Sequence, residues 1–260
     1  MGKLILMIVI LSGVLISNAQ RPPVKKQNKN YVGTTLIAED RIPGTRVKIT
    51  TDSGVIIIRL YDKTPLHRDN FIKLVQQHYF DSLLFHRVIQ SFMIQGGDPD
   101  SKHAPPGQML GNGGPGYTIP AEFDSTLFHK KGVLAAAREG DQVNPTKASS
   151  GSQFYIVQGK VFSDSELDMF KAQRHISIPD SHRRAYKTIG GTPFLDMNYT
   201  VFGEVEKGLE VVDKIASTAK DQNNRPLNDI RMMIEIVPEP VIVKVKAKPV
   251  LKKKYKSVRK

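Results

Sequence analysis

The chain has 260 residues, of which 40% are hydrophobic and 24% charged, so it is long enough to bury a globular core. It contains no Cys, which excludes disulfides, thiolate nucleophiles and thiolate metal ligands. The formal net charge of +13 would suit a nucleic-acid-binding protein if that charge lay on a folded surface.

The excess positive charge lies instead at the two ends of the sequence. Residues 1–32 contain five Lys or Arg and no acidic residue, and residues 244–260 contain nine and no acidic residue. The stretch 33–243 holds the other 24 of the 38 basic residues and all 25 acidic ones, a net charge of −1. Proteins that read nucleic acids usually gather basic and aromatic residues on a folded face, so we expect no specific nucleic-acid binding.

The N-terminal segment 1–19 has the pattern of a secretory signal peptide. A Lys precedes an apolar run over residues 4–16, and small residues precede the expected cleavage site between Ala19 and Gln20. This run is shorter than the ~20 residues that a membrane-spanning helix needs. We therefore expect an extracytoplasmic, periplasmic protein; the alternative is anchoring in the membrane by an uncleaved leader. Residues 20–44 are polar and contain Pro, as is typical of a linker.

The C-terminal segment 239–260 is a Lys-rich basic tail. Its composition favours a disordered, solubilising tail. The alternative is weak contact with anionic envelope surfaces, such as lipid head groups or polysaccharide, to which each nearby Lys would contribute ~1 kcal/mol.

Residues 45–238 are expected to form one domain with a mainly β fold. β-branched runs at 47–51 and 55–60 flank a Gly-containing turn and predict a hairpin. Pro65 is expected to begin a helix with Thr64 as its N-cap. A second helix is expected over 209–219, and short strands over 83–89, 92–94, 132–137, 154–157, 200–205 and 231–237. Many short strands with two helices predict a closed antiparallel barrel.

Residues 161–192 are predicted to be a helical insertion in this domain. Ser163 and Glu166 form a capping-box pattern that should begin a helix ending near Gln173. Pro179 is expected to end the segment that follows, and Gly190-Gly191 to close the insertion.

Several kinds of catalytic site are excluded by their missing patterns. The glycines from 111 to 116 precede no Gly-Lys-Ser/Thr, so they do not form a nucleotide-binding phosphate loop. The seven His residues have no zinc-ligand spacing, and no Gly-x-Ser-x-Gly marks a serine nucleophile. We expect neither a metal nor a cofactor.

Three ordered sequence blocks carry the functional interpretation. Residues 80–97 read FDSLLFHRVIQSFMIQGG and place Arg87 inside an otherwise apolar strand. Taken alone, such an Arg usually packs its stem on the sheet and keeps its head in water. Together with GSQFYI at 151–156 and FLDMNYTVFG at 194–203, however, the segment closely resembles the signatures of cyclophilins, the peptidyl-prolyl cis-trans isomerases. The resemblance covers about 45–237, apart from the insertion, and is strongest to bacterial, envelope-directed members.

The resemblance implies a closed eight-stranded antiparallel barrel, capped by two α-helices, with an active site on its outer face. Arg87 matches the catalytic arginine, and Gln95 and Gln153 match catalytic polar groups near the substrate backbone. The other matches bind substrate, in the apolar pocket for the proline ring or on the rim of the groove: Phe92, Met93, Tyr155 and Leu195 in the pocket, and His86, Ala137, Arg138, Phe194 and Tyr199 on the rim.

These residue types suit the isomerisation of an X–Pro bond, which breaks no covalent bond. Its barrier of ~18–20 kcal/mol is amide resonance, which is lost in the twisted transition state. A donor aimed at the twisted amide stabilises that state over both planar ones. Arg suits this role because it stays charged and presents a planar fork of donors.

Three positions depart from the commoner family pattern. Phe194 stands where many members have a Trp whose indole N–H helps to bind the cyclic peptide cyclosporin, so we expect weak cyclosporin binding. Tyr155 replaces Phe, and its hydroxyl needs a partner when buried. Arg138 stands where many eukaryotic members have Asn, which fits the bacterial type.

The expected partners are proline-containing polypeptides, unfolded or extended, bound by a monomer. The insertion 161–192 either contacts longer substrates or only decorates the rim of the groove. The main alternative function is a non-catalytic proline-peptide-binding or chaperone-like module.

Overall fold

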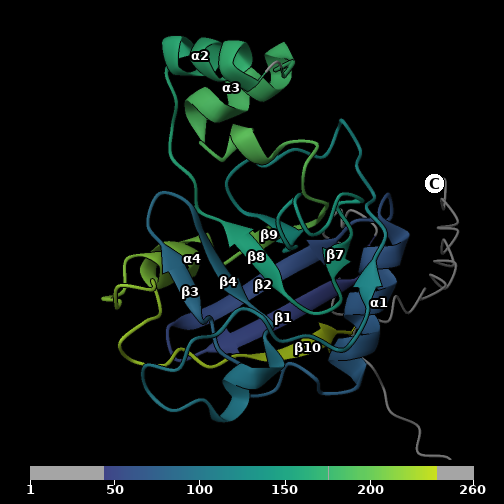
Figure 1. Ribbon diagram of the computed structural model, residues 1–260, viewed down its shortest axis with the longest axis vertical. Helices are drawn as coiled ribbons and strands as arrows, with labels where there is room; N and C mark the ends of the chain where they lie inside the picture. The colour runs from purple at the N-terminus through teal and green to yellow at the C-terminus, as the bar shows by residue number, and fades with distance from the viewer. Residues whose placement is uncertain (1–43, 175, 239–260) are drawn as a thin grey trace, which may run out of the picture. The chain divides into compact units, whose positions relative to one another are not determined.

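The computed structural model describes residues 44–174 and 176–238. The predicted signal peptide, almost all of the predicted linker and the basic tail lie outside these residues. The body is an eight-stranded antiparallel sheet with the strand order β10-β1-β2-β9-β6-β8-β4-β3 (Figure 1). The main strands are β1 (Arg46–Thr51), β2 (Gly54–Leu60), β3 (Arg87–Ile89), β4 (Met93–Gly96), β6 (Val133–Ala136), β8 (Phe154–Val157), β9 (Val201–Lys207) and β10 (Met233–Val237).

Four α-helices and two 3-10 turns accompany the sheet in this part of the chain. The short strands β5 (Thr118–Ile119) and β7 (Ser149–Ser150) pair separately. None of the helices within the described ranges is long and apolar enough to cross a membrane. The helical elements are α1 (Pro65–Gln76), η1 (Pro99–His103), α2 (Asp164–Arg174), α3 (Asp180–Thr188), η2 (Pro193–Leu195) and α4 (Leu209–Ala216). Of these, α1 and α4 are the two helices expected beside the sheet, and α2 and α3 lie in the predicted helical insertion.

The sheet is curled, and the expectation of a closed barrel overstated its closure. The end strands β3 and β10 share no ladder; an isolated bridge between Leu84 and Arg231 joins the chain just ahead of them. The physical reason is that the Val88 N–H, on β3, donates to the Asn224 carbonyl at 2.8 Å. The loop after α4 therefore occupies the edge that β10 would need.

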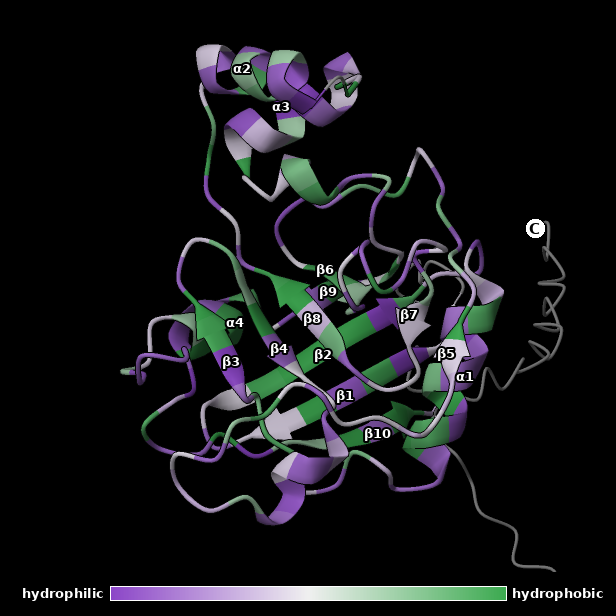
Figure 2. Cartoon of the chain, in the orientation of Figure 1, coloured by the Kyte–Doolittle hydropathy of each residue, from purple (hydrophilic) through white to green (hydrophobic). Residues whose placement is uncertain are grey.

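Alternation along the strands separates two faces of the sheet. Hydrophobic and hydrophilic residues alternate along most of β1 (Figure 2), and along β2, which is mostly apolar, buried side chains alternate with less buried ones. The inward residues, such as Ile94, Leu134 and Ile156, join Phe71 of α1 and Val212 of α4 in the main core. Their neighbours Met93, Ala135 and Tyr155 belong to a second cluster on the outer face. Because side chains alternate with period 2, the second cluster can form a site without disturbing the core.

Helix α1 begins at Pro65 as predicted, but Thr64 does not cap it with its side chain. The Thr64 hydroxyl is buried and has no hydrogen-bond partner among the described residues. Instead, the carboxylate of Glu122 accepts the first free helix N–H groups, those of Leu66 at 3.0 Å and His67 at 2.9 Å. An acceptor distant in sequence thus supplies the cap, and no local pattern could have shown it.

The insertion 161–192 folds around a small core of its own. The capping box is confirmed, since the Ser163 N–H donates to Glu166 at 2.8 Å and the Glu166 N–H donates to the Ser163 hydroxyl at 3.3 Å. Pro179 precedes α3 rather than ending a segment, because its fixed φ suits the entrance to a helix. Phe162, Leu167 of α2 and Tyr186 of α3 are buried together.

Candidate active site

Four residues form one row across the outer face of the sheet: three of them are predicted site residues, and the fourth is their neighbour on β6. Arg87 pairs with Gln95 across β3 and β4, and Gln95 pairs with Tyr155 across β4 and β8. Tyr155 pairs in turn with Ala135 on β6. Directly opposed residues have Cβ atoms ~4.5–5.5 Å apart, so the strand register itself places an arginine beside an amide and an aromatic ring.

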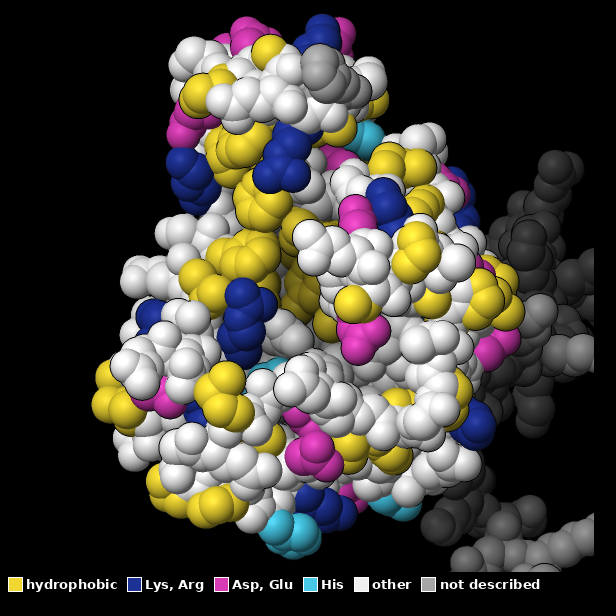
Figure 3. Space-filling model, viewed as in Figure 1, with side chains coloured by type: hydrophobic (Ala, Val, Ile, Leu, Met, Phe, Trp, Pro, Cys, Tyr) yellow, Lys and Arg dark blue, Asp and Glu magenta, His cyan; other side chains and the backbone are white. Residues whose placement is uncertain are grey.

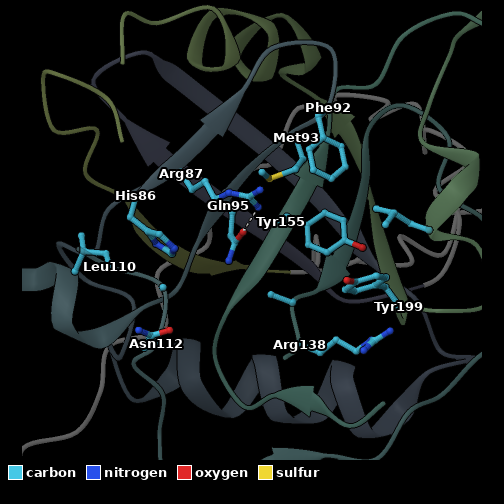
Figure 4. Close-up of a pocket in the computed structure, with 13 residues that line it drawn as sticks. His86, Arg87, Phe92, Met93, Gln95, Leu110, Asn112, Arg138, Tyr155 and Tyr199 are labelled. Atoms are coloured by element: carbon cyan, nitrogen blue, oxygen red, sulfur yellow. Dashed lines mark hydrogen bonds between the residues drawn. The ribbon is translucent and has the colours of Figure 1, made fainter. Parts of the chain in front are cut away.

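A pocket of about 260 Å³ lies over this row (Figure 4). Ten of the twelve predicted site residues line it: His86, Arg87, Phe92, Met93, Gln95, Ala137, Arg138, Tyr155, Leu195 and Tyr199. Phe92, Met93 and Leu195 are apolar residues of its lining, and Arg87 and Gln95 supply polar groups beside Met93. The pocket therefore offers an apolar seat next to a fixed cationic donor.

A chain of hydrogen bonds orients Arg87. Its Nη1 donates to Gln95 Oε1 at 3.1 Å, and Gln95 Nε2 donates to Gln153 Oε1 at 3.0 Å. Gln153 Nε2 then donates to the carbonyls of Gly111 and Gly113, both at 2.8 Å. Since guanidinium can only donate and carbonyls can only accept, the two amides have one consistent orientation. Gln153 is not among the residues that line the pocket. Its side chain joins Gln95 to the loop that contains Gly111 and Gly113.

Three lining residues were missed by the sequence analysis: Leu110, Gly111 and Asn112. They lie in the Gly-rich stretch, which carries no regular pattern to predict. Two buried charged groups hold this loop in place. Asp98 accepts the Gly111 N–H, and Arg225 donates to the carbonyls of Pro105 at 2.9 Å and Gln108 at 3.1 Å. Asp98 and Arg225 could have indicated this loop only if their burial had been known, and the sequence does not show which charged residues are buried.

Arg138 builds the opposite wall. Its guanidinium carbon lies 4.5 Å from the centroid of the Tyr199 ring, and its Nε donates to the Asn198 carbonyl at 2.7 Å. It also pairs with Asp141 at 2.6 Å. The Tyr199 ring meets Tyr155 edge-on, at 5.9 Å between centroids. Arg138 therefore fixes the pocket wall through its Nε, its Nη1 and the face of its guanidinium.

The Tyr155 hydroxyl has the partner that the sequence analysis required. It lies 3.0 Å from His129 Nε2, and His129 Nδ1 lies 3.0 Å from Asp196. Tyr186, on α3, donates to the other oxygen of Asp196 at 2.6 Å. Burial raises the pKa of Tyr155 well above its ordinary value, so this hydroxyl stays protonated. Tyr155, a residue of the pocket lining, is thus joined through His129 and Asp196 to Tyr186 of the insertion.

His86 and Arg87 sit at the pocket with shifted pKa values. His86 is 3% exposed and makes no well-formed hydrogen bond to another described residue. Burial lowers the pKa of His86 to about 4; the charge of Asp98 opposes this shift, and those of Arg87 and Arg225 add to it. Burial also lowers the pKa of Arg87, but a guanidinium remains charged at neutral pH. Near neutral pH His86 is therefore uncharged, and Arg87 carries the positive charge at this edge of the pocket.

Phe194 is the other predicted residue outside the pocket lining. It lies in η2, where its ring centroid is 5.6 Å from that of Phe92 and 6.0 Å from that of Phe170 on α2. Phe194 therefore continues the aromatic wall away from the pocket instead of closing over it.

The outer face of this curled antiparallel sheet carries an apolar pocket bordered by an oriented arginine. Both the fold and this arrangement are those that the resemblance to cyclophilins implies. Comparison with known proteins agrees. Residues 46–235 match the family model "Cyclophilin type peptidyl-prolyl cis-trans isomerase/CLD". The chain belongs to this family of peptidyl-prolyl cis-trans isomerases.

One relative illustrates the match in sequence. A protein of Staphylococcus saprophyticus that is named as a peptidyl-prolyl cis-trans isomerase is 34% identical to this chain over 200 residues. The match covers 75% of this chain and 94% of the relative.

Two solved structures show the same fold. One is a Cryptosporidium parvum cyclophilin type peptidyl-prolyl cis-trans isomerase, with a TM-score of 0.56 and 24% identity over 75% of this chain and 99% of that one. The second is the same protein crystallised in the presence of the dipeptide Ala-Pro, with a TM-score of 0.55 and 23% identity over the same shares.

Proposed function

We propose that this isomerase accelerates X–Pro isomerisation by non-covalent stabilisation of the twisted amide, with Arg87 as the catalytic residue. The observation that carries the proposal is the row Arg87–Gln95–Tyr155 beneath an apolar pocket. It sets a charged donor, held by Gln95, beside an apolar lining that can receive a proline ring.

The geometry suggests how the work is divided. Phe92, Met93 and Leu195 hold the proline ring by apolar contact, so that the acyl side of the bond rotates against a fixed ring. As the amide twists, its nitrogen lone pair localises, and a donor from Arg87 interacts more strongly with the twisted form than with either planar form. Gln95 limits the motion of Arg87, so little reorganisation is needed at the transition state.

We further propose unfolded or extended secreted polypeptides as substrates, in keeping with the signal-peptide pattern at 1–19. Uncatalysed isomerisation takes tens to hundreds of seconds and can limit folding, so an extracytoplasmic isomerase would accelerate the folding of secreted proteins. N-terminal sequencing of the mature protein tests the location: a mature chain that begins at Gln20 supports it, and an intact Met1 in the cytoplasmic fraction contradicts it.

The decisive experiment measures kcat/KM on an X–Pro peptide for the wild type, Arg87→Ala and Arg87→Lys. Removing one such donor should reduce kcat/KM by about 10²–10³-fold. Arg87→Lys keeps the charge but loses the planar fork, so we expect intermediate activity. Peptide binding by Arg87→Ala should persist, because the apolar seat is unchanged.

The alternative, a non-catalytic proline-binding module, makes the opposite prediction. In that case the wild type would bind the peptide without raising the isomerisation rate above background. If instead Arg87→Ala kept full activity, the isomerase would stand and only the role of Arg87 would be refuted.

A further inference from the structure

A row of three aromatic rings leads from the pocket to the insertion. Phe92 lines the pocket, Phe194 follows at 5.6 Å between ring centroids, and Phe170 of α2 follows Phe194 at 6.0 Å. Each of these three side chains is only partly buried. Their faces therefore remain partly available to another molecule.

This row is not needed to complete the core of the insertion. That core is Phe162, Leu167 and Tyr186, which are 3%, 0% and 0% exposed. Phe170 packs edge-on against Phe162 at 5.6 Å and still keeps exposed surface. Figure 3 shows hydrophobic side chains gathered in a continuous column between the helical insertion and the hollow on the outer face of the sheet. Contiguous exposed apolar surface of this kind marks a binding site more often than scattered residues do.

We propose that Phe92, Phe194 and Phe170 form an extension of the substrate groove that binds a large apolar side chain of the same polypeptide whose proline occupies the pocket. The inference rests on the proposed function, because the pocket must hold the proline first. The occupant follows from continuity: a chain anchored in the pocket has to leave it over one of its edges, and this edge is aromatic.

The spacing sets the position of that side chain. With ring separations of 5.6 and 6.0 Å, Phe170 lies at most about 12 Å from Phe92. An extended chain covers about 3.3 Å per residue, so the apolar side chain would lie about three or four residues from the proline. The insertion then selects among substrates by sequence context, while the chemistry stays at Arg87.

The test compares peptides of equal length that contain one X–Pro bond. One series carries Phe at successive positions on either side of the proline, with Ser at every other varied position, and the reference peptide carries Ser throughout. A tetrapeptide that is too short to reach Phe170 measures the basal isomerase activity.

For the wild type we expect kcat/KM to be about tenfold higher, or ~1.4 kcal/mol, when Phe lies about three or four residues from the proline. The preference should vanish when Phe lies about eight residues away, which excludes a general effect of hydrophobicity. Since this comparison uses the wild type alone, it does not depend on the folding of any variant.

Phe170→Gln should lose the preference and keep the tetrapeptide activity. Leu227→Gln is the matched control, because Leu227 is 65% exposed and lies outside both the pocket and the aromatic row. A wild type without positional preference, or a folded Phe170→Gln that keeps it, overturns the extended groove. If even the tetrapeptide is not isomerised by the wild type, the proposed function itself fails, and the two failures are thus distinct.

Discussion

The phenolic oxygen of Tyr155 lies 3.0 Å from Nε2 of His129, at the buried end of a network that joins the proposed proline pocket to helix α3. His129 is fully buried and Tyr155 is 4% exposed. Asp196 completes the network, because it accepts from Tyr186 and contacts His129 Nδ1. A tyrosine in an apolar pocket is therefore stabilised by a fixed partner on its far side.

Tyr155→Phe should destabilise the fold while leaving catalysis nearly intact. The substitution removes the hydroxyl and leaves His129 Nε2 buried without a partner, at a cost of ~1–3 kcal/mol. The ring that faces the pocket is unchanged, so kcat/KM should stay within about threefold of the wild type. Denaturant unfolding measures the first quantity and a proline-peptide assay the second.

Tyr117→Phe is the matched control for this change. Its hydroxyl donates to Asn70 at 2.7 Å, but the residue is 40% exposed, so water can replace the lost bond. We expect a change within about 0.5 kcal/mol. Equal stability losses in the two variants would show that the buried network contributes nothing of its own.

Gln153→Ala should reduce activity although Gln153 does not line the pocket. The change leaves Gln95 Nε2 and two loop carbonyls without their partner, so Arg87 is no longer held in one orientation. Misplacement of a catalytic group by ~1 Å can cost up to about 10²-fold, and we expect a loss of about 10- to 100-fold that falls mainly on kcat.

The exposed Gln76 provides the comparison for that variant. Gln76→Ala changes the same residue type at the end of α1, and it should leave kcat/KM unaltered. If Gln153→Ala raised KM with no change in kcat, Gln153 would contribute to substrate binding and not to the orientation of Arg87.

Most of the site residues were predicted from the resemblance of three sequence blocks to the cyclophilin signatures, and the strand pattern agrees with that prediction. Period-2 alternation places Met93 and Tyr155 on the face opposite Ile94 and Ile156, and the motif blocks carry these residues. The register of the strands could not be predicted, because no local sequence pattern shows that Gln95 lies between Arg87 and Tyr155 in the sheet.

Contacts between distant segments explain the features that could not be predicted. The loop wall around Gly111 depends on Asp98 and Gln153, which are far from it in sequence. The open edge of the sheet depends on Asn224, whose carbonyl takes the N–H of Val88. In each case the local structure depends on a hydrogen bond between residues that are separated in the sequence, and such pairs cannot be recognised from the sequence pattern.

Acid should destabilise the protein through His86. Its pKa is lowered from 6.5 to about 4, chiefly by burial, so between these values the unfolded chain binds a proton that the native state does not. The contribution of His86 to the free energy of unfolding, roughly 3 kcal/mol, is therefore fully present above about pH 6.5 and is lost as the pH falls towards about 4.

His86→Gln isolates this contribution, because Gln is polar but does not titrate. Unfolding midpoints measured at about pH 7 and about pH 4.5 should differ by less in the variant than in the wild type. Carboxylates far from His86 affect both proteins alike, so their effect cancels in the comparison; the interaction of His86 with Asp98 is part of the difference that is measured. Parallel stability curves for the two proteins over this range would mean that His86 is not held neutral in the fold.

Cyclosporin should inhibit the wild type only weakly, and Phe194→Trp should strengthen the inhibition. Phe194 has no N–H to donate and packs between Phe92 and Phe170. An indole at this position adds one donor beside the pocket, and one net hydrogen bond of ~1 kcal/mol corresponds to about fivefold tighter inhibition. Inhibition constants from the isomerase assay measure the effect, with uninhibited kcat/KM as the check that the variant is intact. A nanomolar constant for the wild type would contradict the role given to Phe194, since the affinity would then have been reached without the indole.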